Sequence, residues 1–238
     1  MHTKYFESVV LVIAVFAVTL AANAVEYSPF DALGITTGMG LQAADDSLKK
    51  QGWQVKTESA FQIGSTGIKY VQARRYEKGA ETFDIAYALP PSEPSVMSIT
   101  RSTPVSSSGS LVTLDTLRKG LTDRYGPYQH EHIAAFGGSF QWFAGSDPER
   151  CAKASSSGGF LVRRRGGTAT VPNCNGFYLK VSFRLQNRNI GPVVTLMSQH
   201  IVDVDELSES SLRFEAYSAE VIAASEAERT KGAKVPDF

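Results

Sequence analysis

The sequence predicts an α+β fold made of two similar helix-plus-antiparallel-sheet units and a C-terminal helix. Two amphipathic segments, within residues 34–53 and 113–128, have the spacing and the end signals of helices. Each is followed by segments in which apolar residues alternate with a period of two, as in half-buried antiparallel strands. A third helical segment, residues 205–229, is rich in alanine and glutamate.

The first helix carries Leu41, Ala44 and Leu48 on one face, at steps of three and four residues. Its acidic residues come early and its basic residues late, which is the order that the helix dipole favours. These charged residues are Asp45, Asp46, Lys49 and Lys50. We expect Gly52 to end the helix in a left-handed conformation, so that Trp53 packs back on Leu48.

The second helix has the same design. Four apolar residues share its face: Leu114, Leu117, Leu121 and Tyr125. Thr113 is placed as the N-cap, and Gly126 with Pro127 stops the helix. Both helices therefore end with an aromatic residue beside a glycine.

The strands are expected in two groups of four. After the first helix they fall at residues 53–57, 67–77, 82–89 and 95–101. After the second they fall at residues 140–144, 160–165, 177–185 and 193–202. Proline-rich residues 90–95 form a hairpin connection, and residues 102–110 link the two groups. The plan is one helix followed by a meander, twice.

An internal repeat is predicted from the last two strands of each group. An offset of 98 residues places Phe83 on Val181, Ile85 on Phe183 and Pro94 on Pro192. Tyr87 then falls on Leu185 and Val96 on Val194. The predicted organisation is a signal peptide at 1–24, a first unit at 25–104, a second unit at 105–204, and a C-terminal helix and tail at 205–238. The last helix either docks on the sheet or presents its apolar stripe to a partner.

The N-terminus has the three parts of a secretory signal peptide. Lys4 precedes an apolar run, Val9 to Val18, and small residues follow at Ala22 and Ala24. We expect cleavage after Ala24 and a periplasmic or secreted mature protein. A membrane anchor is the alternative, but the run is shorter than the roughly 20 residues of a usual membrane span.

The two cysteines, Cys151 and Cys174, are expected to form one disulfide in an oxidising compartment. The disulfide would close a loop that holds the glycine- and serine-rich residues 155–159 and the arginines at 163–165. Metal binding is the alternative, although no CxxC spacing supports it. The three arginines either bind an anionic group or lie in solvent at the end of a strand.

Composition excludes some partners. The chain has 24 basic and 24 acidic residues, so neither nucleic acid nor an anionic membrane surface is expected as a partner. Gly34, Gly38 and Gly40 stand before the first helix, but the lysine and hydroxyl of a phosphate-binding loop are missing, as is the GxGxxG pattern. The serine clusters match no nucleophile motif. We predict no cofactor and no catalytic site.

Three histidines carry the rival hypothesis. His130 and His132 share a face if they lie on a strand, as a metal pair can, and His200 would have to supply a third ligand. A metal-dependent or hydrolytic periplasmic enzyme would use these three residues. An ordinary surface strand is the alternative that we favour.

The stretch from Gly34 to Trp53, with Gly38-Met39 before the helix, resembles small bacterial envelope proteins of the BamE (SmpA/OmlA) type. The doubled helix-plus-sheet plan is similar to the tandem-repeat fold of β-lactamase inhibitory proteins. This chain differs from BamE-like proteins in its length and in lacking a lipidated N-terminal cysteine. The resemblance implies protein–protein contact in the cell envelope, and it assigns no functional residue. A non-catalytic binding protein with a protein partner is therefore expected.

Overall fold

The computed structural model describes residues 28–105, 111–145, 176–188 and 191–231. The elements are α1 (Leu41–Lys50), β1 (Gln54–Gln62), β2 (Lys69–Lys78), β3 (Glu81–Tyr87), β4 (Val96–Pro104), β5 (Val112–Thr113), α2 (Leu114–Tyr125), β6 (His130–Ala134), β7 (Gly137–Ala144), β8 (Phe177–Arg188), β9 (Gly191–Asp203) and α4 (Val204–Lys231). The α+β class is confirmed.

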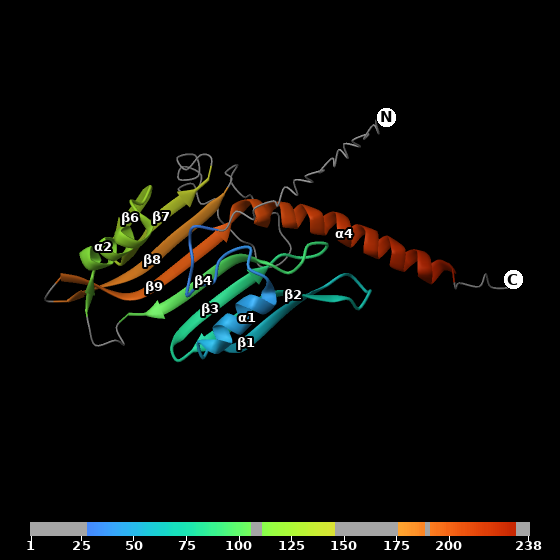
Figure 1. The fold of residues 1–238 in the computed structure, drawn as a ribbon, viewed down its shortest axis with the longest axis horizontal. Helices are drawn as coiled ribbons and strands as arrows, with labels where there is room; N and C mark the ends of the chain where they lie inside the picture. Colours follow the sequence, from blue (N-terminus) through green and yellow to red (C-terminus); the bar gives the residue numbers. More distant parts are fainter. Residues whose placement is uncertain (1–27, 106–110, 146–175, 189–190, 232–238) are drawn as a thin grey trace, which may run out of the picture.

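The strands form one antiparallel sheet rather than two (Figure 1). Its order is β1-β2-β3-β4-β9-β8-β7-β6, and the short β5 pairs with β9 beyond the end of β4. Strands β4 and β9, the last of each predicted unit, therefore lie side by side at the centre. Strands β1 and β6 are the two edges.

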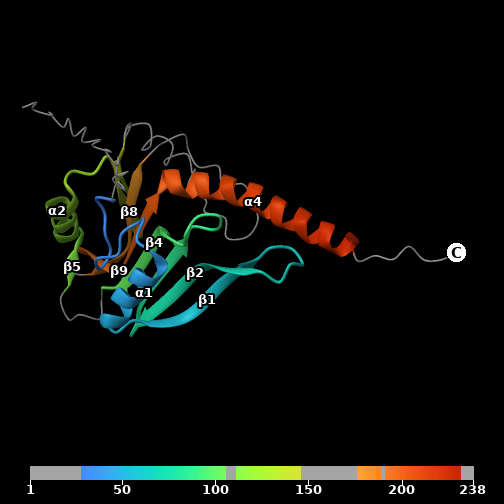
Figure 2. The same ribbon diagram turned by 45° about the vertical axis from the view of Figure 1, so that its right-hand side comes forward.

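Helices α1 and α2 cover one face of this sheet (Figure 2). Ala44 and Leu48 of α1 and Leu117 of α2 belong to the same core cluster as Phe83 of β3 and Phe140 of β7. In β3 every second residue is buried, which is the alternation that the sequence predicts. Burial of these apolar side chains stabilises the fold at about 25 cal/mol per Å² removed from water.

Both helices end as predicted. Gly52 has a φ of +84°, and the Trp53 amide donates to the Leu48 carbonyl at 3.0 Å. The Thr113 hydroxyl accepts from the Thr116 amide at 3.2 Å, and Gly126 follows α2 with a φ of +78°. The acidic residues of α1 follow its first turn, which contains none, and Lys49 and Lys50 lie in the last turn as predicted.

Helix α4 docks along the end of the sheet and then continues beyond it (Figure 1). Val204 and Leu207 pack with Val202 of β9 in a second, smaller apolar cluster. Further along, Phe214 contacts Phe61 with ring centroids 4.9 Å apart. Tyr217 meets Tyr70 through their hydroxyls at 2.9 Å. The long helix therefore joins β9 to the distant β1–β2 hairpin.

The two halves of the sheet share one register. Ile85 pairs with Ile99, and the residues 98 positions later, Phe183 and Met197, pair with each other. Each of these strand pairs has one register shift, directly before Tyr87 in the first half and directly before Leu185 in the second. These two residues are again 98 positions apart.

The strand partners of the two helix starts, Ser95 and Val193, are also 98 positions apart, whereas the helix starts themselves are 73 positions apart. Gly40, the N-cap of α1, bridges to Ser95, and Thr113, the N-cap of α2, pairs with Val193. The repeat of two units stays a prediction, and this common register is the physical argument for it.

Several predicted features lie outside the described residues. They are the signal peptide at 1–24, Cys151 and Cys174, and the strand at 160–165 with its arginines. Some strands are longer than predicted. Strand β1 runs to Gln62, and β4 runs to Pro104, so the first residues of the expected linker belong to a strand. No helix within the described ranges is both long enough and apolar enough to cross a membrane.

Candidate functional site

The three histidines lie on one face of the sheet but do not meet. His130 and His132 are on the edge strand β6, and His200 is on β9. Strands β7 and β8 separate them, because His130 pairs with Gln141, Gln141 with Lys180, and Lys180 with His200. Three strand spacings of about 4.8 Å place His130 roughly 14 Å from His200. The described residues contain no group of three metal-ligating side chains.

That face, opposite α1 and α2, carries two polar rows that cross the whole sheet. We call it the polar face. The first row is His130, Gln141, Lys180, His200, Thr100, Asp84, Arg75 and Thr57. The second row is His132, Ser139, Ser182, Ser198, Ser102, Thr82, Glu77 and Gln54. Every position in both rows is polar.

The two ends of the polar face differ in charge. Toward β1, Arg75 donates to Asp84 through two hydrogen bonds of 2.7 and 3.1 Å. Toward β6, Lys180 and Arg184 form no ion pair within the described part of the chain. No carboxylate accompanies them on this face of β6, β7, β8 and β9 in the described ranges. This half of the face therefore presents cations and hydrogen-bond donors.

His200 is neutral at physiological pH. Burial, with a smaller contribution from the Lys180 ammonium, lowers its pKa to about 4. The Tyr178 ring meets the imidazole edge-on, with centroids 6.4 Å apart and planes at 88°. Burial also raises the pKa of Tyr178. The centre of the polar face thus offers neutral hydrogen-bonding groups, with the positive charge beside them.

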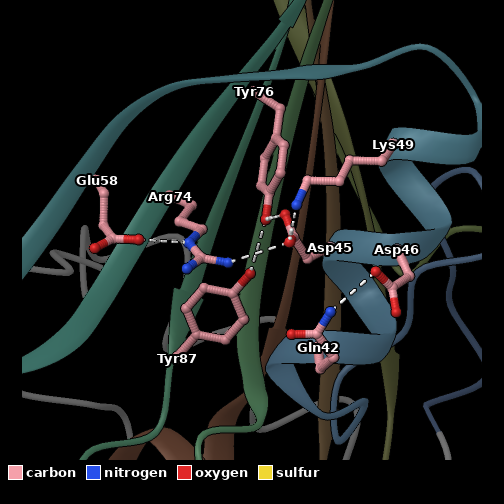
Figure 3. A network of polar contacts seen from close by, with 8 residues as sticks. All are labelled: Gln42, Asp45, Asp46, Lys49, Glu58, Arg74, Tyr76 and Tyr87. Atoms are coloured by element: carbon pink, nitrogen blue, oxygen red, sulfur yellow. Dashed lines mark hydrogen bonds and ion pairs between the residues drawn. The ribbon is translucent and has the colours of Figure 1, made fainter.

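A second polar cluster lies on the opposite face, between α1 and the first strands (Figure 3). Asp45 is only 4% exposed and points from α1 toward the sheet. Its carboxylate accepts from the Tyr76 hydroxyl at 3.2 Å and from the Lys49 ammonium, and it lies 3.6 Å from the Arg74 guanidinium. Asp45 was expected in the early part of the helix, and its burial was not predicted.

The members of this cluster satisfy one another. Arg74 also donates to Glu58 at 2.7 Å, and the hydroxyls of Tyr76 and Tyr87 are 3.2 Å apart. Burial raises the pKa of both tyrosines, so both remain protonated. The carboxylates of Asp45 and Glu58 balance the positive charges of Arg74 and Lys49. Because each group has a partner inside the protein, the cluster fastens α1 to β2 and is not a site for a ligand.

The alternation of polar residues was the available signal for the polar face. Ser98, Thr100 and Ser102 occupy alternate positions of β4, as do Ser198 and His200 of β9. The prediction of these strands rested on their apolar residues and not on the polar positions between them.

Comparisons with known proteins leave the function to be argued from this geometry. No protein family, curated protein sequence or solved structure matches the chain.

Proposed function

We propose that this protein is an exported, non-catalytic module of the cell envelope that binds a protein partner through the polar face. The observation that carries the proposal is the pair of unbroken polar rows on a nine-stranded sheet. A sheet held by hydrogen bonds on both sides of most strands presents its side chains at fixed spacings. Such a preordered surface suits recognition, because little conformational entropy is lost when it binds.

Polar groups on this face are positioned rather than freely solvated. The part-buried hydroxyls of Ser102 and Ser198 are 3.2 Å apart, whereas Ser139 and Gln141, at 5% and 4% exposed, lie too deep for a partner to contact. Protein interfaces outside their apolar centre are built from this type of hydrogen-bonding side chain. The resemblance of residues 34–53 to BamE-type envelope proteins supports the same class of function.

The partner proposal is tested by site-specific photocrosslinking in the native cell. A photoreactive amino acid at Ser182 or Ser198 should give a crosslinked product with one protein. The matched control carries the same amino acid at Lys119, on the outer side of α2 and 78% exposed at its side chain. The proposal is refuted if the polar-face positions give no crosslink, or if Lys119 captures the same protein equally well.

Export is tested separately. We expect the mature protein in the periplasmic or secreted fraction, with Val25 as its first residue. Intact mass measurement and N-terminal sequencing of the fractionated protein provide the check. Full-length protein that remains in the cytosol would contradict the export part of the proposal.

A further inference from the structure

The two edges of the sheet differ in how they are protected from pairing with another chain. Edge β1 has two register shifts against β2 and carries the charged side chains of Lys56 and Glu58. Its far end lies against α4, where Phe61 contacts Phe214. Register shifts, charges and a covering helix are the usual means by which proteins keep an edge strand from pairing with another chain. Edge β1 is therefore protected.

Edge β6 lacks these protections. It pairs with β7 over five residues without a register shift, and it contains neither lysine nor proline. Ile133 is 42% exposed, and Phe136, in the turn to β7, is 82% exposed. In the described part of the chain no strand pairs with the outer side of β6. An unbroken edge with exposed apolar side chains is a template for an added strand.

The charge that β6 carries is already balanced within the chain. Its carboxylate, Glu131, accepts from Arg118 and from the Tyr128 hydroxyl, each at 2.8 Å. Helix α2 packs mainly on β5 and β9, and the Arg118 side chain crosses the Phe140 ring to reach this carboxylate. The helix therefore leaves the outer side of β6 open. Because Glu131 has its cation, the edge selects neither a strongly acidic nor a strongly basic segment.

We propose that β6 pairs with β6 of a second copy of this chain, antiparallel and about a two-fold axis, so that the two sheets become one. An axis through His132 lets all five residues of each strand pair. His130 then lies opposite Ala134 of the second copy, and Glu131 lies opposite its Ile133. The backbone hydrogen bonds of this pair supply affinity without any change in the fold.

The sequence of β6 selects this register. Directly opposed residues on paired strands point to the same face, so the axis has to pass through a residue and not between two. An axis through Glu131 would place two carboxylates directly opposite each other, which destabilises a strand pair. An axis through Ile133 would leave only residues 132–134 of each strand paired. The axis through His132 combines the full five-residue overlap with no carboxylate facing a carboxylate.

The same register covers the exposed apolar side chains. The two copies of Ile133 become diagonal neighbours, which is within reach of long side chains. Phe136 lies four positions beyond the axis and Tyr128 four positions before it, so each Phe136 comes beside Tyr128 of the other copy. Aromatic pairs add to the stabilisation from buried area. Two neutral imidazoles of His132 on the axis can share a hydrogen bond, since each ring has a donor and an acceptor nitrogen.

Pairing in this way doubles the polar face. The two-fold axis of an antiparallel edge pair is perpendicular to the sheet, so the polar faces of both copies lie on the same side. The second polar row ends at His132, and the two copies of this row meet at the axis. The inference does not rest on the proposed function, but it gives the bound partner a surface twice as wide.

The association is measured by sedimentation velocity of the mature full chain at concentrations from about 1 to 200 µM. We expect a reversible monomer–dimer equilibrium with a dissociation constant in the micromolar range, because a five-residue strand pair is a small interface. Ile133→Glu should weaken this dimer at least about tenfold, since it places a carboxylate opposite Glu131 at two symmetric positions.

Val55→Glu is the matched control. Val55 is also β-branched and 42% exposed, and it lies on the other edge strand, β1. We expect the dimer of this variant to be as stable as that of the unchanged protein. Thermal unfolding of both variants verifies that they are folded.

Cysteine crosslinking tests the register without a change of charge. His132→Cys places a thiol on the axis, opposite the same thiol of the second copy, with Cβ atoms about 4.5–5.5 Å apart. Ala134→Cys places its two thiols four residues out of register, about 13 Å apart along the strands. A short bismaleimide should give a covalent dimer of the His132→Cys chain and little of the Ala134→Cys chain. The unchanged protein gives the background from Cys151 and Cys174.

The inference is overturned by a monomer at every concentration, by equal effects of Ile133→Glu and Val55→Glu, or by equal crosslinking of the two cysteine variants. A photoreactive amino acid at Ile133 that captures a different protein in the native cell, and no second copy, would also overturn it. That outcome would assign the edge to a strand of another protein. Failure of the proposed function is distinct, because it is decided by crosslinks to other proteins from Ser182 and Ser198.

Discussion

Asp45→Asn should destabilise the protein by about 2 kcal/mol although it removes no atom from the core. Asparagine keeps the shape of the side chain but loses the charge that faces Arg74 and Tyr76. Those two contacts are shielded, since the side chains of Asp45 and Arg74 are 5% and 17% exposed. Hydrogen bonds to charged groups contribute about 1.5–3 kcal/mol.

The ion pair with Lys49, the third partner of Asp45, adds little to the expected loss of unfolding free energy. Its side chain is 55% exposed, so solvent screens its ion pair with Asp45. Arg74 also keeps its contact with Glu58 in the variant. The expected loss therefore stays near 2 kcal/mol and below the range of about 3–5 kcal/mol for a buried ion left without any partner.

Urea unfolding followed by tryptophan fluorescence measures this loss, and Trp53 directly after α1 is a local reporter. For a protein of this size the melting temperature should fall by about 4–8 °C. Asp46→Asn is the control, because Asp46 bonds only the exposed Gln42, and its effect should remain within about 0.5 kcal/mol. Equal effects of the two substitutions would show that the buried cluster does not stabilise the fold as we argue.

Three further predictions concern the burial of His200, the space around two glycines, and the disulfide. Because burial lowers the pKa of His200 to about 4, the unfolded chain binds a proton below pH 6.5 while the folded chain does not. Stability should thus be full above pH 6.5 and fall by about 2–3 kcal/mol as the pH drops to 4. In the His200→Gln variant the urea midpoint should depend less on pH between pH 6.5 and 4 than in the unchanged protein. An equal pH dependence in both proteins would contradict the lowered pKa of His200. Gly138→Ala should destabilise by about 1–3 kcal/mol, because the new Cβ would clash with the His132 carbonyl oxygen. Gly120→Ala, with open space around it in α2, should instead stabilise by about 0.5–1 kcal/mol, and thermal melts that rank the two variants the other way would refute both. Mass spectrometry of exported protein should find Cys151 joined to Cys174, whereas free thiols at both positions would exclude the disulfide.

Helix ends and strand periods were predictable because they depend on neighbouring residues. Gly52 and Thr113 mark helix ends through their own backbone and side-chain chemistry. The alternation in β3 likewise reports which side of that strand is buried. These local signals were sufficient for the α+β class and for the placement of α1, α2 and α4.

The long-range arrangement was not predictable in the same way. Periodicity does not state which strands are neighbours, so the pairing of β4 with β9 left no signal in either segment. The distance between His130 and His200 depends on that strand order. The burial of Asp45 was not predicted for a related reason, because it depends on Arg74 and Tyr76 on a strand that the helix meets only in the folded protein.

Because β4 and β9 are neighbours at the centre of the sheet but far apart in the sequence, β4 is synthesised well before its partner strand. Strand β4 is complete roughly 90 residues before β9 emerges from the ribosome, and its residues from Ser98 to Pro104 pair with β9 in the finished sheet. Until then the first half presents an unpaired apolar edge, which is the type of surface that drives aggregation of nascent chains. A chain truncated before β9 would keep this edge of β4 unpaired, however complete its own helix and strands are.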